Sequence, residues 1–274
     1  MTTPTIYAEP RLIDSIEDCL FYHTIDLPGV GTQEGMWDLR PNVGKYLGNV
    51  DLRGKRVLEL GTANGYLCFH MESQGADVVA FELAPDEVSD IVPYALVNSA
   101  QRAIEMEPWL EKIRNAFWFS HQALDSSAKV VYGNVYNVPN ELGLVDVSTF
   151  GSILLHLRDP FLALQNALKL TRETVIVTEP IWHWFNFVRF LVARQRFGGT
   201  MVFLPDSELR EPATTWWYLA PTAVRRFISV LGFEESKVSY HYQRHSETGR
   251  KVLCYTVVGT RTVPIEEGRW TVDD

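Results

Sequence analysis

The residues between 59 and 82 could hold a charged cofactor. Glu59 directly precedes a short turn from Gly61 to Gly65, which reads Gly-Thr-Ala-Asn-Gly. Glu82 follows Gly61 by 21 residues and ends a second apolar segment. An acid at this place in a nucleotide-binding fold accepts hydrogen bonds from the hydroxyls of a ribose. The spacing therefore predicts a site for a cofactor that contains a nucleoside.

The spacing of the glycines distinguishes two cofactor classes. A dinucleotide site follows G-x-G-x-x-G, because the pyrophosphate approaches the backbone at the start of a helix. Here the pattern is G-x-A-x-G, so Gly65 comes one residue too early. Glu59 would repel a pyrophosphate, but it would favour S-adenosylmethionine, which carries a sulfonium and an ammonium and no phosphate. S-adenosylmethionine is the favoured cofactor; a nicotinamide cofactor, or a tight turn without a ligand, remains the alternative.

Residues 52–260 resemble the class I S-adenosylmethionine-dependent methyltransferases. The segment VLELGTANG is similar to their first motif, with Ala63 in place of the middle glycine. VVYGNVYNVP resembles the segment after their third strand, and VDVSTFGSILLHLRDP resembles their fourth strand and the turn after it. The resemblance implies that Glu82 binds the ribose and that Asn134 and Val135 contact the adenine. The expected cofactor-binding residues from these motifs are Glu59, Gly61, Thr62, Ala63, Gly65, Glu82, Leu83, Asn134 and Val135.

The elements that must position these residues alternate between strand and helix. Short apolar segments, typical of strands buried on both faces of a parallel sheet, lie at 56–60, 78–82, 129–132, 145–151 and 174–178. Helices are expected at 65–74, 86–103, 108–126 and 160–170. Two alternating segments flank SETG and predict a hairpin. We predict an α/β, Rossmann-like, seven-stranded sheet, mostly parallel with an antiparallel C-terminal hairpin and with helices on both faces.

Residues 1–51 are expected to form an N-terminal helix and loop that cover the cofactor site, ahead of a methyltransferase domain at 52–274. Apolar spacing predicts the helix over 11–24. In the following loop, Trp37 could face the sulfonium through a cation–π contact, and Arg40 could pair with the methionine carboxylate. Alternatively, WDLRP only packs against and caps the next helix.

A narrower resemblance concerns FYHTIDLPGVGTQEGMWDLRP. It is similar to a subgroup related to the tRNA wobble-uridine carboxymethyltransferases, many relatives of which act in natural-product or glycan pathways. This resemblance leaves the methyl acceptor open.

We expect the methyl acceptor to bind near side chains that follow the fourth and fifth predicted strands. His156 is the leading candidate for a catalytic base, because it follows the fourth strand; the alternative is that HLRDP only starts the next helix. His183 and Glu179 are further candidates for this role. An aromatic insertion at about 180–217 is expected to close over the acceptor. The expected substrate-binding residues are Tyr22, His23, Trp182, Trp184 and Phe187.

Composition limits the partners. The formal net charge is −9 over 274 residues, which argues against a broad nucleic-acid surface. Three cysteines without metal-ligand spacing, and no long apolar segment, predict a cytoplasmic protein without a metal site or a membrane span. We expect a methyltransferase that acts on an oxygen or nitrogen of a small molecule in a biosynthetic pathway. A tRNA-modifying enzyme is the alternative, and the oligomeric state is not indicated.

Overall fold

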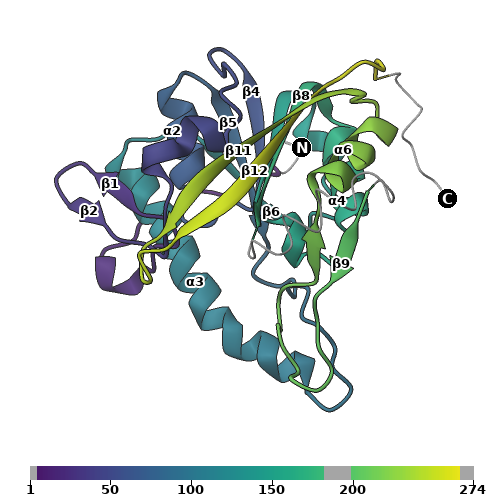
Figure 1. The fold of residues 1–274 in the computed structure, drawn as a ribbon. Coiled ribbons are helices and arrows are strands. Elements are labelled where there is room, and N and C mark those ends of the chain that lie inside the picture. The colour runs from purple at the N-terminus through teal and green to yellow at the C-terminus, as the bar shows by residue number, and fades with distance from the viewer. Residues whose placement is uncertain (1–4, 182–198, 266–274) are drawn as a thin grey trace.

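The computed structural model describes residues 5–181 and 199–265. The strands of its main sheet are β3 (Trp37–Asp38), β4 (Arg56–Leu60), β5 (Asp77–Leu83), β6 (Lys129–Gly133), β7 (Val145–Gly151), β8 (Thr171–Ile181), β11 (Glu235–His245) and β12 (Lys251–Thr260). Their order is β3-β11-β12-β8-β7-β4-β5-β6 (Figure 1). The strands from β6 to β8 are parallel, and β12 is antiparallel to both of its neighbours. The predicted sheet and its C-terminal hairpin are confirmed.

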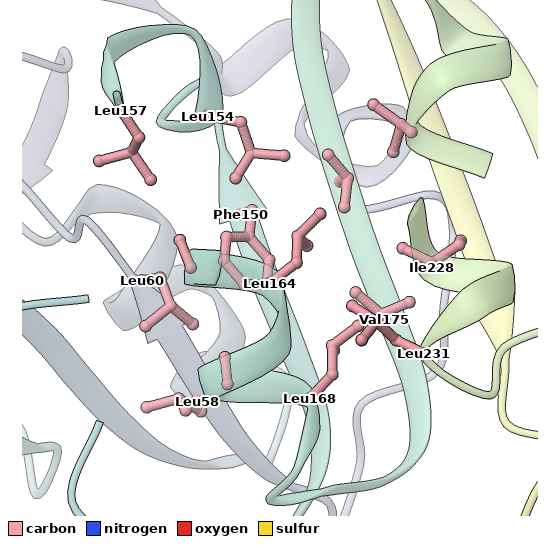
Figure 2. Close-up of a cluster of buried hydrophobic side chains, with 14 of the residues drawn as sticks. Leu58, Leu60, Phe150, Leu154, Leu157, Leu164, Leu168, Val175, Ile228 and Leu231 are labelled. Carbon is pink, nitrogen blue, oxygen red and sulfur yellow. The ribbon is translucent and has the colours of Figure 1, made fainter. Parts of the chain in front are cut away.

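Helices cover both faces of this sheet. They are α1 (Val43–Tyr46), α2 (Tyr66–Ser73), α3 (Ser99–Ala123), α4 (Pro160–Leu168) and α6 (Pro221–Val230). Successive side chains of a strand point to opposite faces, so Val57 packs with α2 and α3 while Leu58 packs with α4 and α6. Figure 2 shows the second of these cores, where Leu58 and Phe150 of the sheet lie near Leu164 of α4. Strands buried on both faces explain the continuous apolar segments in the sequence.

The sheet contains one strand more than predicted. β3 pairs with the end of β11, where Asp38 lies opposite Arg244 and Trp37 lies opposite His245. This two-residue strand is too short to leave an alternating pattern in the sequence. The seven predicted strands are the other seven of the sheet.

The predicted helix over 86–103 is wrong. α3 begins only at Ser99, because the Asn98 side chain accepts a hydrogen bond from Gln101 N at 3.1 Å and caps the first turn. The helix then continues through Pro108, which removes a single backbone donor and does not end it. The end of the helix predicted over 86–103 and the helix predicted over 108–126 are therefore parts of one helix.

The predicted N-terminal helix over 11–24 is also wrong. Only Ile16–Asp18 forms a 3-10 turn (η1). The segment is bound to α3 at two places, where Leu20 N donates to Lys112 O at 2.9 Å and Asn115 donates to Asp18 O at 3.1 Å. Tertiary contacts thus satisfy backbone groups that a helix would have paired. Leu12, which belonged to the expected apolar face, is 79% exposed.

The remaining elements are short. They are β1 (Ile25–Leu27), β2 (Gly31–Gln33), η2 (Arg40–Asn42), η3 (Asn140–Leu142), η4 (Leu154–His156), β9 (Met201–Phe203) and β10 (Trp217–Leu219). β1 pairs with β2, and β9 pairs with β10, each pair antiparallel. The described part of the predicted insertion is fixed to η4 by Trp216 N, which donates to Leu155 O at 2.8 Å. Among the helices in the described ranges, none has the length and apolarity needed to cross a membrane.

Candidate active site

A pocket of about 400 Å³ opens at the carboxyl ends of the parallel strands. Its wall includes Gly61 after β4, Glu82 of β5, Gly133 of β6 and Gly151 of β7. β4 and β7 are neighbours in the sheet, but the chain continues from β4 to β5 on one side and from β7 to β8 on the other. Open α/β sheets bind ligands at such a point. The volume lies in the range of small-molecule sites, roughly 300–1,000 Å³.

The structure divides the predicted site residues into three groups. The residues that line the pocket are Tyr22, His23, Gly61, Ala63, Glu82, Leu83, Asn134, Val135 and His156. The residues that lie outside its wall are Trp37, Arg40, Glu59, Thr62, Gly65 and Glu179. The residues that fall outside the described ranges are Trp182, His183, Trp184 and Phe187.

The turn after β4 requires glycine at two places. Gly61 has φ +75°, and a Cβ there would lie 2.7 Å from Ile153 Cδ1. Gly65 has φ +83°, and a Cβ there would lie 2.4 Å from Phe69 Cε2. Ala63 also has a positive φ, of 50°, which explains why related motifs favour glycine at its position. Gly65 therefore shapes the turn from behind the pocket wall.

Glu82 is held with its carboxylate facing the pocket. Its Oε2 accepts a hydrogen bond from Ala63 N and its Oε1 accepts one from Leu83 N, both at 2.9 Å. Burial raises the pKa of Glu82, and these two backbone donors act in the opposite direction. Because each carboxylate oxygen keeps a further lone pair, Glu82 can still accept two hydroxyls of a ligand.

Glu59 lies beneath the turn. Its side chain is 2% exposed and accepts a hydrogen bond from Thr62 Oγ1 at 2.6 Å. Burial raises the pKa of Glu59 to about 8, so the group is largely protonated at neutral pH. Glu59 lies outside the pocket wall, so the structure gives no direct contact by which its side chain would favour a cationic cofactor. Glu59 and Thr62 instead hold the turn in shape.

His156 has a ring nitrogen whose lone pair can accept a proton. Its Nδ1 lies 2.7 Å from Thr214 O, and a carbonyl oxygen can only accept, so the proton is on Nδ1. Nε2 therefore keeps its lone pair, in a residue that lines the pocket. Burial lowers the pKa of His156, which keeps the imidazole neutral. These are the properties of a general base.

Glu179 positions the turn that carries His156. It is 2% exposed, and its Oε1 accepts a hydrogen bond from Leu154 N at 2.9 Å, at the start of η4. Burial raises the pKa of Glu179 to about 8. The candidate catalytic role of Glu179 is not supported, because the carboxyl is sealed behind the turn.

Trp37 and Arg40 lie outside the pocket wall. Arg40 Nε pairs with Asp38 Oδ1 at 2.9 Å, and Arg40 NH1 pairs with Asp26 Oδ1 at 2.7 Å. The ring of Trp37 lies 4.9 Å from that of His245. These contacts do not support the predicted roles of Arg40 at a methionine carboxylate and of Trp37 at a sulfonium. Arg40 already has two carboxylate partners, and both residues fix the N-terminal segment to the edge of the sheet.

Two buried residues of the site were missed from sequence. Asn64, in the middle of the turn, accepts from His23 N at 2.7 Å and donates to His23 O at 3.0 Å. Arg114 of α3 lines the pocket and is 3% exposed, and it pairs with Glu107 and with Glu111. The spacing of Glu107, Glu111 and Arg114 on a helix could have indicated this cluster.

The side of the pocket that carries Asn134 contacts the loop before α3. The Asn134 side chain accepts from Tyr136 N at 3.0 Å and donates to Glu87 Oε2 at 3.2 Å. Tyr136 in turn donates its hydroxyl proton to Asp90, another residue of the pocket wall. The Asn134 oxygen thus has one occupied lone pair and one left for a ligand.

Comparisons with protein families and with solved structures relate the chain to known proteins. A family model described as a methyltransferase domain matches residues 38–235. The crystal structure of EvdMO1 is 16% identical with a TM-score of 0.51, covering 89% of this chain and 45% of that one. The N-terminal domain of EvdMO1 in the presence of SAH and D-fucose is 15% identical with a TM-score of 0.49, covering 90% and 92%.

A third solved structure is magnesium protoporphyrin IX methyltransferase (ChlM) from Synechocystis PCC 6803 with bound SAH. It is 11% identical with a TM-score of 0.47, covering 82% of each chain. No curated protein matches the sequence. The similarity to EvdMO1 supports the fold described above.

Proposed function

Because the chain belongs to the methyltransferase domain family, we propose that it transfers the methyl group of S-adenosylmethionine to an oxygen or nitrogen of a small molecule. The observation that carries the proposal is the fixed carboxylate of Glu82 in a pocket at the strand ends. S-adenosylmethionine, when bound, supplies an electrophilic methyl group on a sulfonium.

The residues of the pocket fit this donor. Glu82 would accept the two ribose hydroxyls, and Asn134 and Val135 would lie against the adenine. Gly61 and Ala63 leave room for the amino-acid end beside the turn, because neither has a side chain beyond Cβ. The acidic wall suits a cationic ligand better than a pyrophosphate.

His156 would remove the proton of the acceptor. Its Nε2 lone pair would take the proton from a hydroxyl while the new oxygen–carbon bond forms, or from an ammonium before the nitrogen attacks, because a protonated amine has no lone pair with which to form the bond. The imidazolium that results keeps its Nδ1–H bonded to the Thr214 carbonyl, which orients the ring and stabilises the charge. Glu179 contributes indirectly, because it holds the turn on which His156 lies.

We further propose that the acceptor is a small molecule of a biosynthetic pathway and not tRNA. The net charge of −9 opposes a broad phosphate-binding surface. In the described part of the pocket wall, the arginine is Arg114, which is already paired with Glu107 and Glu111. The narrower resemblance to the wobble-uridine subgroup leaves the acceptor open.

Calorimetry with S-adenosylhomocysteine tests the donor site through Glu82. Hydrogen bonds to a charged group contribute about 1.5–3 kcal/mol. We therefore expect Glu82→Ala to weaken binding roughly 10- to 100-fold. Glu141→Ala, which removes an exposed acid outside the pocket, is the matched control and should bind like the wild type. Unchanged affinity in Glu82→Ala, with the fold intact by circular dichroism, would place the ribose elsewhere.

A further inference from the structure

His23 lies in the pocket wall on the side of the turn after β4. Asn64 holds both its backbone N–H and its backbone carbonyl, at 2.7 and 3.0 Å. Asn64 is itself fully buried in the middle of the turn. The position of His23 is therefore tied to the turn that encloses the amino-acid end of the donor.

The two ring nitrogens of His23 differ in their surroundings. The residue is 8% exposed, and Nδ1 is buried without a hydrogen-bond partner. Nε2 is not among the buried unpartnered atoms, and no residue of the described ranges forms a hydrogen bond with it. Because His23 lines the pocket, Nε2 is the nitrogen that a ligand can reach.

The proton of the neutral ring belongs on Nε2. A buried N–H without a partner is rarer than an acceptor with an unused lone pair, so Nδ1 is better left unprotonated. Burial lowers the pKa of His23 to about 3, so the ring stays neutral at physiological pH. His23 thus presents an N–H donor to the pocket. His156 is the opposite case, because its Nδ1 carries the proton and its Nε2 is the acceptor.

We propose that His23 donates its Nε2–H to the carboxylate of the amino-acid end of S-adenosylmethionine. This inference rests on the proposed function and assigns one contact within the same pocket. A donor suits the carboxylate and not the ammonium, which has only donors to offer. The position agrees, since the ring lies 6.3 Å from that of Tyr66, the first residue of α2, where the helix presents its partial positive charge.

Two substitutions and two ligands test the assignment. The amide nitrogen of glutamine can take the place of Nε2, whereas that of asparagine takes the place of Nδ1. The ligands are S-adenosylhomocysteine and its decarboxylated analogue, which lacks only the carboxylate. Calorimetry gives the dissociation constant of each pair, and the thermal unfolding midpoint of each variant checks the fold.

We expect His23→Asn to bind S-adenosylhomocysteine at least 10-fold more weakly than the wild type. His23→Gln should remain within about threefold of the wild type, as expected when one charge-assisted hydrogen bond is kept. Neither substitution should change the affinity for the decarboxylated analogue by more than about threefold. An equal loss for both ligands, or no loss in His23→Asn, would overturn the assignment.

A second measurement does not depend on the variants. Nitrogen-15 chemical shifts of the wild-type His23 ring should show a protonated Nε2 and an unprotonated Nδ1. The reverse pattern would contradict the proposal. If the wild type does not bind S-adenosylhomocysteine at all, the proposed function fails; if it binds without coupling between His23 and the carboxylate, only this inference fails.

Discussion

At the scale of single residues, the environment of each titratable group decides what that group can do. Near the turn after β4 and the turn after β7, Glu82, His23 and His156 line the pocket, whereas Glu59 and Glu179 lie outside its wall. Glu59 and Glu179 have raised pKa values of about 8, because both are buried, and each accepts a hydrogen bond from its own turn. Their role is to position other groups.

His156 should be neutral and protonated at Nδ1. Burial lowers the pKa of its ring, so protonation should occur only below pH 6.5, the ordinary value for histidine. The neutral imidazole, which is the base form, is therefore present from neutral pH down past pH 6.5 and is lost as the pH falls further. Long-range proton–nitrogen NMR correlations between pH 5 and 8 measure both properties, and His156→Gln assigns the signals. A ring that titrates above pH 6.5, or one protonated at Nε2, would contradict its role as base.

At the scale of elements, the turn between β4 and α2 combines backbone strain with close packing. Gly65 and Gly249 both have positive φ, but a Cβ at Gly249 would meet nothing within 4 Å. Gly249→Ala should therefore cost only the strain, ~1–2 kcal/mol. Gly65→Ala should cost a further ~1–3 kcal/mol from overpacking against Phe69 and Phe117.

Urea unfolding of both alanine variants gives these free energies, and calorimetry gives their affinity for S-adenosylhomocysteine. Gly65→Ala should also weaken the binding of S-adenosylhomocysteine several-fold, because the displaced turn carries Ala63. Gly249→Ala should leave this affinity unchanged. Equal losses of stability in the two variants would show that packing at Gly65 does not shape the turn.

Glu59 should make the stability of the same turn depend on pH. Its folded pKa of about 8 lies above the ordinary 4.5, so its stabilising contribution is complete below pH 4.5 and is lost as the pH rises to about 8. Each pKa unit corresponds to about 1.4 kcal/mol. The free energy of unfolding should fall by a few kcal/mol more in the wild type than in Glu59→Gln over this range. Chemical unfolding at several pH values measures the difference, and parallel profiles would refute the role of Glu59.

The strands were predictable because burial on both faces requires a continuous apolar segment in the sequence of each strand. β4 and β7 match the expected ranges 56–60 and 145–151. The N-terminal segment was not predictable, because its backbone partners are Lys112 and Asn115, about a hundred residues away. Local periodicity contains no information about such contacts.

The site was predictable in position and less so in orientation. Motif spacing placed Gly61, Glu82 and His156 at the strand ends, and all three line the pocket. Spacing could not indicate that Glu59 points into the core or that Arg40 pairs with Asp26 and Asp38, since these depend on side-chain direction and tertiary partners.

At the scale of the whole molecule, the order of the strands limits the possible chemistry. The sheet has five parallel strands, and the antiparallel β12 lies between β8 and β11. The residues of the sheet that line the pocket all lie at the carboxyl ends of the parallel strands. Figure 1 shows α3 extending from the sheet toward the segment that carries β9, so that the elements around the pocket come from distant parts of the chain. The proposed donor and acceptor would share this pocket.

The central claim is that this site binds a methyl donor and not a dinucleotide. Isothermal titration calorimetry of the full chain with S-adenosylhomocysteine, and separately with NADH, tests it most directly. We predict saturable binding of S-adenosylhomocysteine at one site per chain, and no heat of binding with NADH at the same concentrations. Binding of NADH without binding of S-adenosylhomocysteine would contradict the account.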